Sequence, residues 1–373
     1  MISPGGTLGI LGGGQLGRML CLEARRMGYR TIVWSGSEVA EPTQGVADEV
    51  LLKPFSDEEA HAYFVSEVDV ATVEFENIDY SVLESVDRAV GLHPCPEAVA
   101  ICQNREREKR FLESLGIPCA PFRVVEDAGQ LAQGIEEVGG KGVLKTAAFG
   151  YDGKGQVRVQ SGMAWEQVWE DFNFPRAVLE KWIPFEREIS VMVARGAGGT
   201  MEVYDVAENI HREHVLDYSI VPARISVEVA EQARELAMKI AEGLGYRGIM
   251  GVEFFVSNED GLLVNEMAPR PHNSGHHTMD ACATSQFEQQ LRAVTGLQLG
   301  ATTLLSSTVM LNLLGDLWRG DDLFGRLSQE RDVTWHVYGK SSHRGLRKCG
   351  HANFLGEGSL KRMLALKADV LSC

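Results

Sequence analysis

The 373-residue chain carries a net charge of −16, and 44% of its residues are hydrophobic while 24% are charged. This composition is typical of a globular protein with two or three domains. The acidic charge argues against nonspecific binding to nucleic acid or anionic lipid, because both need clustered cations. Since no long apolar run and no basic leader are present, we expect a cytoplasmic protein. The seven cysteines lack C-x-x-C spacing, which indicates reduced, mostly buried thiols.

Residues 1 to about 95 alternate apolar runs with amphipathic segments, a pattern that predicts a parallel sheet covered by helices. The string "TLGILGG" (7–13) predicts a strand, "QLGRMLCLEARRMG" (15–28) a helix and "YRTIVWS" (29–35) a second strand. The segments "VDVATVEFE" (68–76) and "DYSVLESVDRA" (79–89) continue the alternation. The first unit is therefore expected to be an α/β domain, with helices on the faces of a parallel sheet.

The turn after the first strand has the spacing Gly12-x-Gly14-x-x-Gly17, which occurs in dinucleotide sites. Such a site also needs an acidic residue at the end of the second strand to hold the ribose hydroxyls. Trp34 stands near that place, and Glu38 comes late. The turn is better interpreted as a set of backbone N–H groups facing a substrate phosphate, or as a tight turn without a ligand.

From about residue 100 to 305 the pattern is typical of antiparallel strands. The strings "KGVLKTAA" (141–148) and "QVRVQSG" (156–162) flank a glycine-rich loop, and the segments 176–183, 187–196 and 201–209 alternate as half-buried strands do. A long helix (227–245) precedes a hairpin, "MGVEFFVSNEDGLLVNEM" (250–267). After about residue 305, short strands and a helix at 359–371 predict a small β-rich cap.

Lys145 lies inside an apolar strand, just ahead of the loop "KTAAFGYDGKGQ" (145–156). A buried lysine without an anionic partner is costly, so a bound anion at Lys145 is the favoured explanation. Glycines would let this loop close over a phosphate-bearing ligand. A plain hairpin loop is the alternative.

Two glutamates in the hairpin form a candidate metal site. If the hairpin loop is the four residues 258–261, Glu253 lies directly opposite Glu266 with both carboxylates on one face. A divalent cation would remove the repulsion between them, and magnesium prefers such oxygen ligands. A one-residue slip would place them on opposite faces as two solvated glutamates.

The string "PRPHNSGHHT" (269–278) contains His272, His276 and His277. These histidines lack the helical i, i+4 spacing with a carboxylate that zinc motifs show. Arg270 stands between two prolines, which indicates a cation held on a stiff backbone for an anionic group.

Together, Lys145, the glycine-rich loop, "EKWI" before Glu188 and the pair Glu253 and Glu266 resemble the ATP-grasp ligases. The strings "GGGQLGRM", "GYDGKGQ", "NEMAPRPHNSGHHT" and "YGK…RKCGH" are similar to the branch of that superfamily that acts in purine biosynthesis. The resemblance covers essentially the whole chain. It implies a mixed α/β and α+β fold: a Rossmann-like parallel-sheet domain (1–100), an ATP-grasp domain (101–305) with a lid at about 120–185, and a small β-rich C-terminal domain (306–373).

The resemblance also implies the reaction. ATP and Mg²⁺ would convert bicarbonate to carboxyphosphate, and the amine of 5-aminoimidazole ribonucleotide would be carboxylated to 5-(carboxyamino)imidazole ribonucleotide, with ADP and phosphate released. A homodimer is expected. The alternatives are another carboxylating or formylating ATP-grasp enzyme, a Rossmann oxidoreductase, and a nucleotide-binding regulator without turnover.

The roles implied by the resemblance are assigned residue by residue. The ATP-binding residues are Arg105, Lys145, Gly150, Tyr151, Asp152, Gly153, Lys154, Gly155, Gln156, Glu180, Lys181, Trp182, Ile183, Glu188, His211, Asn265 and Glu266. The residues that bind the ribonucleotide are Gln15, Leu16, Glu76, Arg270, His272, Asn273, Lys340 and Arg347. The catalytic residues are Tyr151, Asp152, Lys154, Arg270 and His272, and the magnesium ligands are Glu253 and Glu266.

Overall fold

The structure, a computed structural model, describes residues 1–38, 42–148, 155–320 and 322–371. Its N-terminal part is a four-stranded sheet in the order β3-β2-β1-β4, and every pairing in this sheet is parallel. The predicted parallel sheet is therefore confirmed. The elements are β1 (Thr7–Leu11), α1 (Gln15–Arg26), β2 (Arg30–Trp34), β3 (Glu49–Leu51), α2 (Glu58–Glu67), β4 (Val70–Val73) and α3 (Tyr80–Val90).

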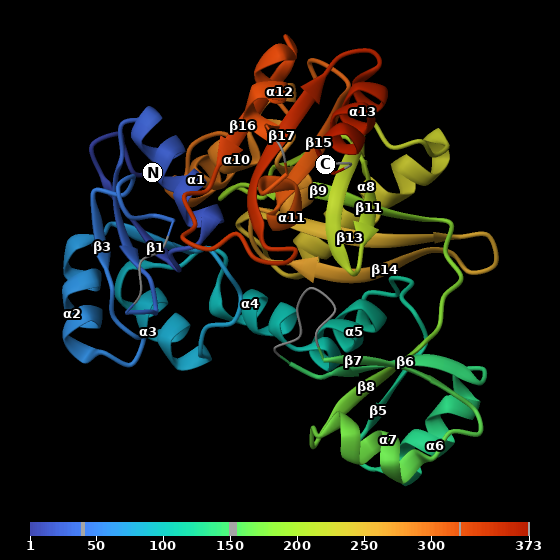
Figure 1. The fold of residues 1–373 in the computed structure, drawn as a ribbon. Coiled ribbons are helices and arrows are strands. Elements are labelled where there is room, and N and C mark those ends of the chain that lie inside the picture. Colours follow the sequence, from blue (N-terminus) through green and yellow to red (C-terminus); the bar gives the residue numbers. More distant parts are fainter. Residues whose placement is uncertain (39–41, 149–154, 321, 372–373) are drawn as a thin grey trace.

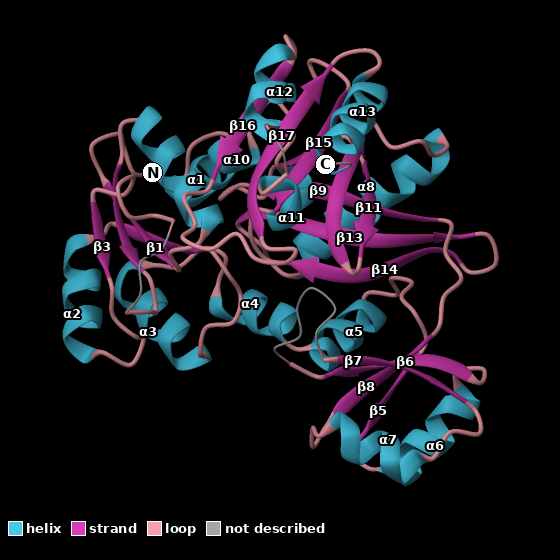
Figure 2. Cartoon of the chain, viewed as in Figure 1, coloured by secondary structure: helices cyan, strands magenta, loops and turns pink. Residues whose placement is uncertain are grey.

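Two helices connect this part to the rest of the chain, α4 (Pro96–Gln103) and α5 (Arg105–Ser114). The domain boundary predicted near residue 100 lies within α4, and the domain bounds stay a prediction. A smaller lobe follows, with the strand order β5-β8-β6-β7, and α6 and α7 pack together against it (Figure 2). Its elements are β5 (Phe122–Val125), α6 (Ala128–Glu137), β6 (Lys141–Thr146), β7 (Gln156–Gln160), α7 (Trp165–Phe172) and β8 (Ala177–Lys181).

The third and largest sheet has nine strands, in the order β14-β13-β9-β11-β12-β15-β17-β16 with β10 paired to β9. Its strands are β9 (Arg187–Arg195), β10 (Met201–Val203), β11 (Ala207–Arg212), β12 (Val215–Val221), β13 (Gly248–Ser257), β14 (Gly261–Ala268), β15 (Thr308–Leu314), β16 (Val333–Val337) and β17 (Lys348–Leu355). The C-terminal strands β15, β17 and β16 thus extend this sheet and do not form one of their own (Figure 1).

The helices of this part complete the fold. They are α8 (Val227–Gly243), the 3-10 turn η1 (Asn273–Gly275), α9 (Thr278–Ala281), α10 (Gln286–Thr295), α11 (Gly315–Trp318), α12 (Leu323–Gln329) and α13 (Ser359–Leu371). Helix α10 packs against α1 and β4 of the N-terminal part as well as against β13. Among the described residues, no helix is both long and apolar enough to cross a membrane.

The half-buried alternation predicted for the strands at 176–183 and 187–196 is wrong. In β8, all residues but one are buried, and in β9 six consecutive residues are buried, so neither strand alternates between buried and exposed positions. In β9, Val191 and Val193 belong to the core that includes residues of α8, while Met192 and Ala194 face a second cluster with Tyr204. Strand β9 is apolar on both sides because both faces of the sheet are covered there.

Candidate active site

A cavity of about 760 Å³ lies between the smaller lobe and the large sheet. It is lined by β6, β7 and β8 from the lobe and by β9, β11, β13 and β14 from the sheet. The predicted residues that line it are Arg105, Lys145, Gln156, Glu180, Lys181, Trp182, Ile183, Glu188, His211, Glu253, Asn265, Glu266, His272 and Asn273. Predicted residues as far apart in sequence as Arg105 and Asn273 therefore line one cavity.

Some predicted residues do not line this cavity. Gly150, Tyr151, Asp152, Gly153 and Lys154 lie outside the described residues. Gly155 is described and pairs through its carbonyl with Thr146 N at 2.9 Å, but it is not on the cavity wall. The remaining predicted residues away from the wall are Gln15, Leu16, Glu76, Arg270, Lys340 and Arg347.

The anionic partner of Lys145 is another side chain. Lys145 Nζ lies 2.9 Å from Glu180 Oε2, and Lys109 Nζ lies 3.6 Å from Glu180 Oε1, with all three residues buried. Burial alone would raise the pKa of Glu180, but the charges of Lys109, Lys145 and Arg105 lower it to about 2. Glu180 supplies a counter-charge, so burial of Lys145 alone does not indicate a bound anion. Lys145 still reaches the cavity wall, and its contact with ATP stays a prediction.

Glu253 and Glu266 pair directly across the β13–β14 hairpin, as predicted. The predicted four-residue loop is wrong, because Ser257 pairs with Gly261 and leaves three residues between them. A β-bulge then shifts the register between Phe254 and Glu253 by one residue, which restores the pairing of the two glutamates. Burial and the neighbouring Glu266 charge raise the pKa of Glu253 above its usual range.

Oxygen atoms around this pair fit a magnesium ion. The buried Asn265 Oδ1 has no hydrogen-bond partner among the described residues. No group of three or more His, Cys, Asp or Glu side chains converges there as metal ligands within the described ranges. Two carboxylates with phosphate oxygens from a nucleotide form the hard donor set that Mg²⁺ takes.

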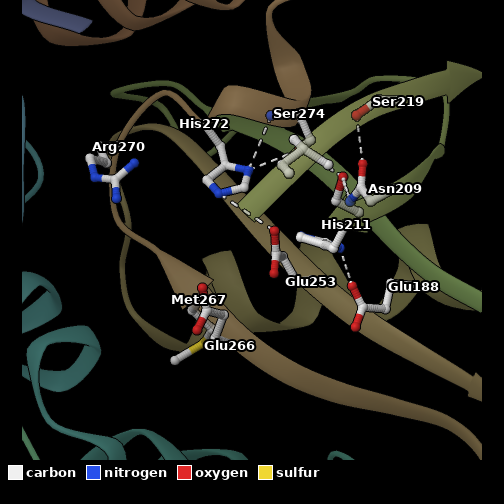
Figure 3. Close-up of polar contacts among 12 residues, drawn as sticks. Glu188, Asn209, His211, Ser219, Glu253, Glu266, Met267, Arg270, His272 and Ser274 are labelled. Atoms are coloured by element: carbon white, nitrogen blue, oxygen red, sulfur yellow. Dashed lines mark hydrogen bonds and ion pairs between the residues drawn. The ribbon is translucent and has the colours of Figure 1, made fainter. Parts of the chain in front are cut away.

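A chain of hydrogen bonds orients His272 (Figure 3). Ser219 Oγ donates to Asn209 Oδ1 at 2.8 Å, and Asn209 Nδ2 donates to Ser190 Oγ at 2.9 Å. Ser190 Oγ donates to Ser274 Oγ at 2.7 Å, and the Ser274 hydroxyl lies 2.9 Å from His272 Nδ1.

Each hydroxyl in this chain has a single proton, so the orientation of the Asn209 amide, with Oδ1 toward Ser219 and Nδ2 toward Ser190, sets the direction of the chain. Ser274 donates to Nδ1 of His272, and the backbone N–H of Ser274 also points at this atom from 3.4 Å. The remaining nitrogen, Nε2, therefore carries the proton and lies 3.5 Å from Glu253 Oε1. Burial, followed by the Arg270 charge, lowers the pKa of His272 well below its usual range, so the ring is neutral.

The wall beside the glutamates holds a second acid–histidine contact. His211 Nδ1 contacts Glu188 Oε2. Burial alone would lower the pKa of His211, but the Glu188 and Glu253 carboxylates raise it. The two amide atoms of the Asn273 side chain, Nδ2 and Oδ1, are buried and have no hydrogen-bond partner among the described residues. They are therefore available to a ligand.

The glycine turn holds a carboxylate of the protein itself. The backbone N–H of Leu16 donates to Glu74 Oε1 at 3.2 Å. Burial raises the pKa of Glu74, while the Arg270 charge and the backbone N–H groups of the glycine turn lower it. A Cβ on Gly14 would collide with Glu74 Oε1. The Leu16 amide thus already has a carboxylate acceptor, and the interpretation of the turn as a wall for the substrate phosphate or ribose stays a prediction.

Arg270 and Glu76, both predicted to bind the ribonucleotide, form an ion pair with each other. Arg270 Nε lies 2.5 Å from Glu76 Oε2, and Nη2 lies 3.1 Å from Oε1. Burial alone would lower the pKa of Arg270, but Glu76, Glu74 and Glu266 raise it. Arg270 is thus within the electrostatic reach of both the glycine turn and the carboxylate pair.

Lys340 and Arg347 lie close enough to affect each other. Burial, followed by the Arg347 charge, lowers the pKa of Lys340 to about 8, while Glu74 raises it. Two cations are therefore held near the glycine turn, where an anionic group would relieve their repulsion.

Several residues of the site were missed by the sequence analysis. They are Glu74, Lys109, Arg158, Phe185, Ser190, Asn209, Ser274 and Lys348. Glu74 could have been found, since it directly follows β4, and the carboxyl ends of the adjacent parallel strands β1 and β4 meet at one sheet edge. The others have no local signal, because their partners come from distant strands.

Comparisons with known proteins agree with this geometry. Residues 6–103 match the ribonucleotide synthetase preATP-grasp domain, 110–287 the ATP-grasp domain, and 308–361 the phosphoribosylaminoimidazole carboxylase C-terminal domain. The fold and the cavity define an ATP-grasp ligase that uses ATP.

Curated relatives show to which family of ATP-grasp ligases the chain belongs. The N5-carboxyaminoimidazole ribonucleotide synthase of Brucella melitensis is 44% identical over 353 residues, which cover 94% of this chain and 96% of that protein. The chain belongs to the N5-carboxyaminoimidazole ribonucleotide synthase family, so the predicted resemblance and its place in purine biosynthesis are confirmed.

Solved structures carry the same fold. The ADP complex of an N5-carboxyaminoimidazole ribonucleotide synthetase matches with a TM-score of 0.93 and 41% identity, over 98% of this chain and 97% of that one. An Aspergillus clavatus synthase in complex with ADP and 5-aminoimidazole ribonucleotide matches with a TM-score of 0.88 and 28% identity, over 99% of each chain.

Proposed function

We propose that the protein carboxylates the amine of 5-aminoimidazole ribonucleotide with bicarbonate at the expense of ATP. The products are 5-(carboxyamino)imidazole ribonucleotide, ADP and phosphate. The observation that carries this proposal is the cavity that is lined both by the cations Arg105 and Lys145 and by the carboxylates of Glu253 and Glu266. Family membership and the ligands named for the Aspergillus relative support the choice of substrate.

The nucleotide would occupy the cavity between the lobe and the sheet. Trp182 and Ile183 would form an apolar edge for the base, and Glu188, also on the cavity wall, would accept hydrogen bonds from ribose hydroxyls. Lys145 and Arg105 would neutralise the phosphates. These side chains would hold the γ-phosphate in place, which is the main demand of phosphoryl transfer.

Glu253, Glu266 and the Asn265 side-chain oxygen would hold Mg²⁺. When bound, the ion would neutralise charge on the transferring phosphoryl group. Arg105 Nη2, 3.8 Å from Glu266 Oε2, would restrain that carboxylate from the side of α5.

The bond changes follow from the poor electrophilicity of bicarbonate. A bicarbonate oxygen attacks the γ-phosphorus and ADP leaves, which gives carboxyphosphate. The ribonucleotide amine then attacks the carboxyl carbon and phosphate leaves. The predicted catalytic residues Tyr151, Asp152 and Lys154 lie outside the described residues and stay a prediction for the bicarbonate step.

The ribonucleotide would bind beside the glycine turn. Lys340 and Arg347 would contact its 5′-phosphate, because two neighbouring cations suit a dianion. His272 would donate a hydrogen bond from Nε2 toward the reacting groups, and Asn273 would supply its unpaired amide. The homodimer and the cytoplasmic location also stay predictions.

Phosphate release tests the proposal. With ATP, Mg²⁺, bicarbonate and 5-aminoimidazole ribonucleotide present, we expect stoichiometric release of phosphate and ADP, and omission of any one component should abolish it. Phosphate release that is independent of both bicarbonate and the ribonucleotide would contradict the proposed substrates.

A further inference from the structure

Helix α5 runs along the outer edge of β14, between the large sheet and the smaller lobe (Figure 1). Strand β14 is the last strand of its sheet, so half of its backbone groups face away from β13. Near Val264, this edge is covered by the chain itself, since Val264 N donates to Pro118 O at 2.8 Å. Beyond Val264, the partners come from α5.

Two consecutive residues of α5 bind the backbone on either side of Glu266. Lys109 Nζ donates to the carbonyl oxygen of Asn265 at 3.2 Å, and Met267 N donates to Glu108 Oε1 at 2.5 Å. These are the two peptide groups that flank the Cα of Glu266. Glu108 is 2% exposed and Lys109 is 0% exposed, so both contacts are shielded from water.

These contacts act at the β-bulge. Without the bulge, the pairing of Phe254 with Val264 would continue to Glu253 with Asn265. Glu266 would then lie opposite Val252 and point to the other face of the sheet. The bulge is therefore what brings the Glu266 carboxylate to face Glu253. A bulge disrupts the ladder locally, and its unpaired groups need partners from outside the sheet.

We propose that Glu108 and Lys109 are positioning residues for Glu266, because they hold its two flanking peptide groups and so fix the bulge that sets its carboxylate opposite Glu253. This inference rests on the proposed function only where it treats the two glutamates as metal ligands. Neither residue of the α5 pair touches the reacting atoms or lines the cavity.

Lys109 also connects the bulge to the smaller lobe. Its ammonium group is shared between Asn265 O and Glu180 Oε1, and the other oxygen of Glu180 accepts from Lys145. The carbonyl before Glu266 is thus linked through Lys109 and Glu180 to Lys145, a lysine on the opposite wall. Lys109 couples the position of the carboxylate pair to the wall that faces the phosphates.

Substitutions with matched controls can separate positioning from general stability. Glu108→Leu removes the acceptor of the Met267 N–H, whereas Glu108→Gln keeps an oxygen acceptor of the same reach. Lys109→Met removes the donor to Asn265 O and leaves Glu180 paired with Lys145. All variants are made in the full chain, and cooperative thermal unfolding is recorded for each.

The readout is Mn²⁺ binding in the presence of ADP, followed by electron paramagnetic resonance without turnover. Loss of a partner that orients a metal ligand typically weakens metal binding by about 10- to 100-fold. We expect at least about tenfold weaker Mn²⁺ binding in Glu108→Leu and Lys109→Met, and wild-type binding in Glu108→Gln.

Wild-type Mn²⁺ affinity in folded Glu108→Leu and Lys109→Met would overturn the positioning role, whatever their melting temperatures. If Glu108→Leu does not fold, Lys109→Met decides the outcome, because Glu180 keeps its ion pair with Lys145 in that variant. Glu266→Gln serves as the reference. Unchanged Mn²⁺ binding in that variant would reject the metal assignment itself, which is a different result from failure of the positioning role.

Discussion

Lys145 Nζ donates to Glu180 Oε2 at 2.9 Å, so this buried lysine has a counter-charge within the protein in addition to the bound anion that the sequence suggested. Glu180 also neutralises Lys109, so one carboxylate serves two buried lysines. Burial lowers the pKa of Lys145, and the Glu180 carboxylate opposes this shift while the ammonium group lies at the cavity wall.

Glu180→Leu should destabilise the protein strongly. The substitution leaves Lys109 and Lys145 buried without a counter-charge, and loss of one partner of a buried ion pair costs about 3–5 kcal/mol. Denaturant unfolding measures the change. Glu84→Gln, which removes an exposed pair with Arg88, is the control and should change the free energy of unfolding by less than about 1 kcal/mol. A loss for Glu180→Leu no larger than that of the control would contradict the prediction.

Glu266→Gln should remove most turnover and leave the fold intact. The change lowers the negative charge available to Mg²⁺ beside the transferring phosphoryl group, so we expect kcat to fall about 100-fold or more. Steady-state phosphate release in saturating Mg²⁺ measures it, and circular dichroism checks the fold. Activity within about threefold of the wild type would reject Glu266 as a metal ligand.

Lys340→Met should raise the KM for the ribonucleotide by about tenfold, because a charge-assisted hydrogen bond contributes about 1.5–3 kcal/mol. The KM for ATP should hardly change, since Lys340 does not line the nucleotide cavity. An equal rise in both KM values would instead indicate a misfolded C-terminal segment.

The lowered pKa of Lys340 also predicts a pH dependence. Its pKa of about 8 lies below the usual lysine value, so the ammonium charge is lost as the pH rises through about 8. The KM for the ribonucleotide should therefore increase above pH 8 in the wild type. Lys340→Arg is the matched control, because arginine keeps its charge, and its KM should stay flat over the same range. A rise of the same size in Lys340→Arg would assign the pH effect to another group.

Ser190→Ala should change the protonation pattern of His272. The substitution removes the hydroxyl that donates to Ser274, so Ser274 is no longer restricted to donating to His272 Nδ1. Nitrogen-15 NMR of the histidine rings should show a single Nε2–H tautomer in the wild type and a mixture in the variant. Observation of the Nδ1–H tautomer in the wild type would contradict the direction inferred for the chain.

Local patterns predicted much of the fold. The parallel arrangement of β1, β2 and β4 and the helix α1 were predicted from the apolar periodicity of short segments. This periodicity reflects burial of one face of each element. The ATP-binding residues were predicted through the resemblance of several strings, and all of the described ones except Gly155 line one cavity. The half-buried pattern failed for β9 because its second face is covered by residues remote in sequence, which no local period reports.

The sequence by itself determined which residue types carry the chemistry: the acidic pair in the hairpin, the lysine ahead of the glycine-rich loop and the cations near the C-terminus. Only the tertiary structure decided which partner each one has. Glu74 reaches amides 58 positions away, and Glu180 reaches Lys145 at 35 positions. The hairpin shows the reason most clearly. A three-residue loop alone would turn Glu266 away from Glu253, and the backbone of the bulge that corrects it binds side chains of α5, up to 159 positions away along the chain. Because strand register depends on such long-range hydrogen bonds, a local pattern cannot encode it.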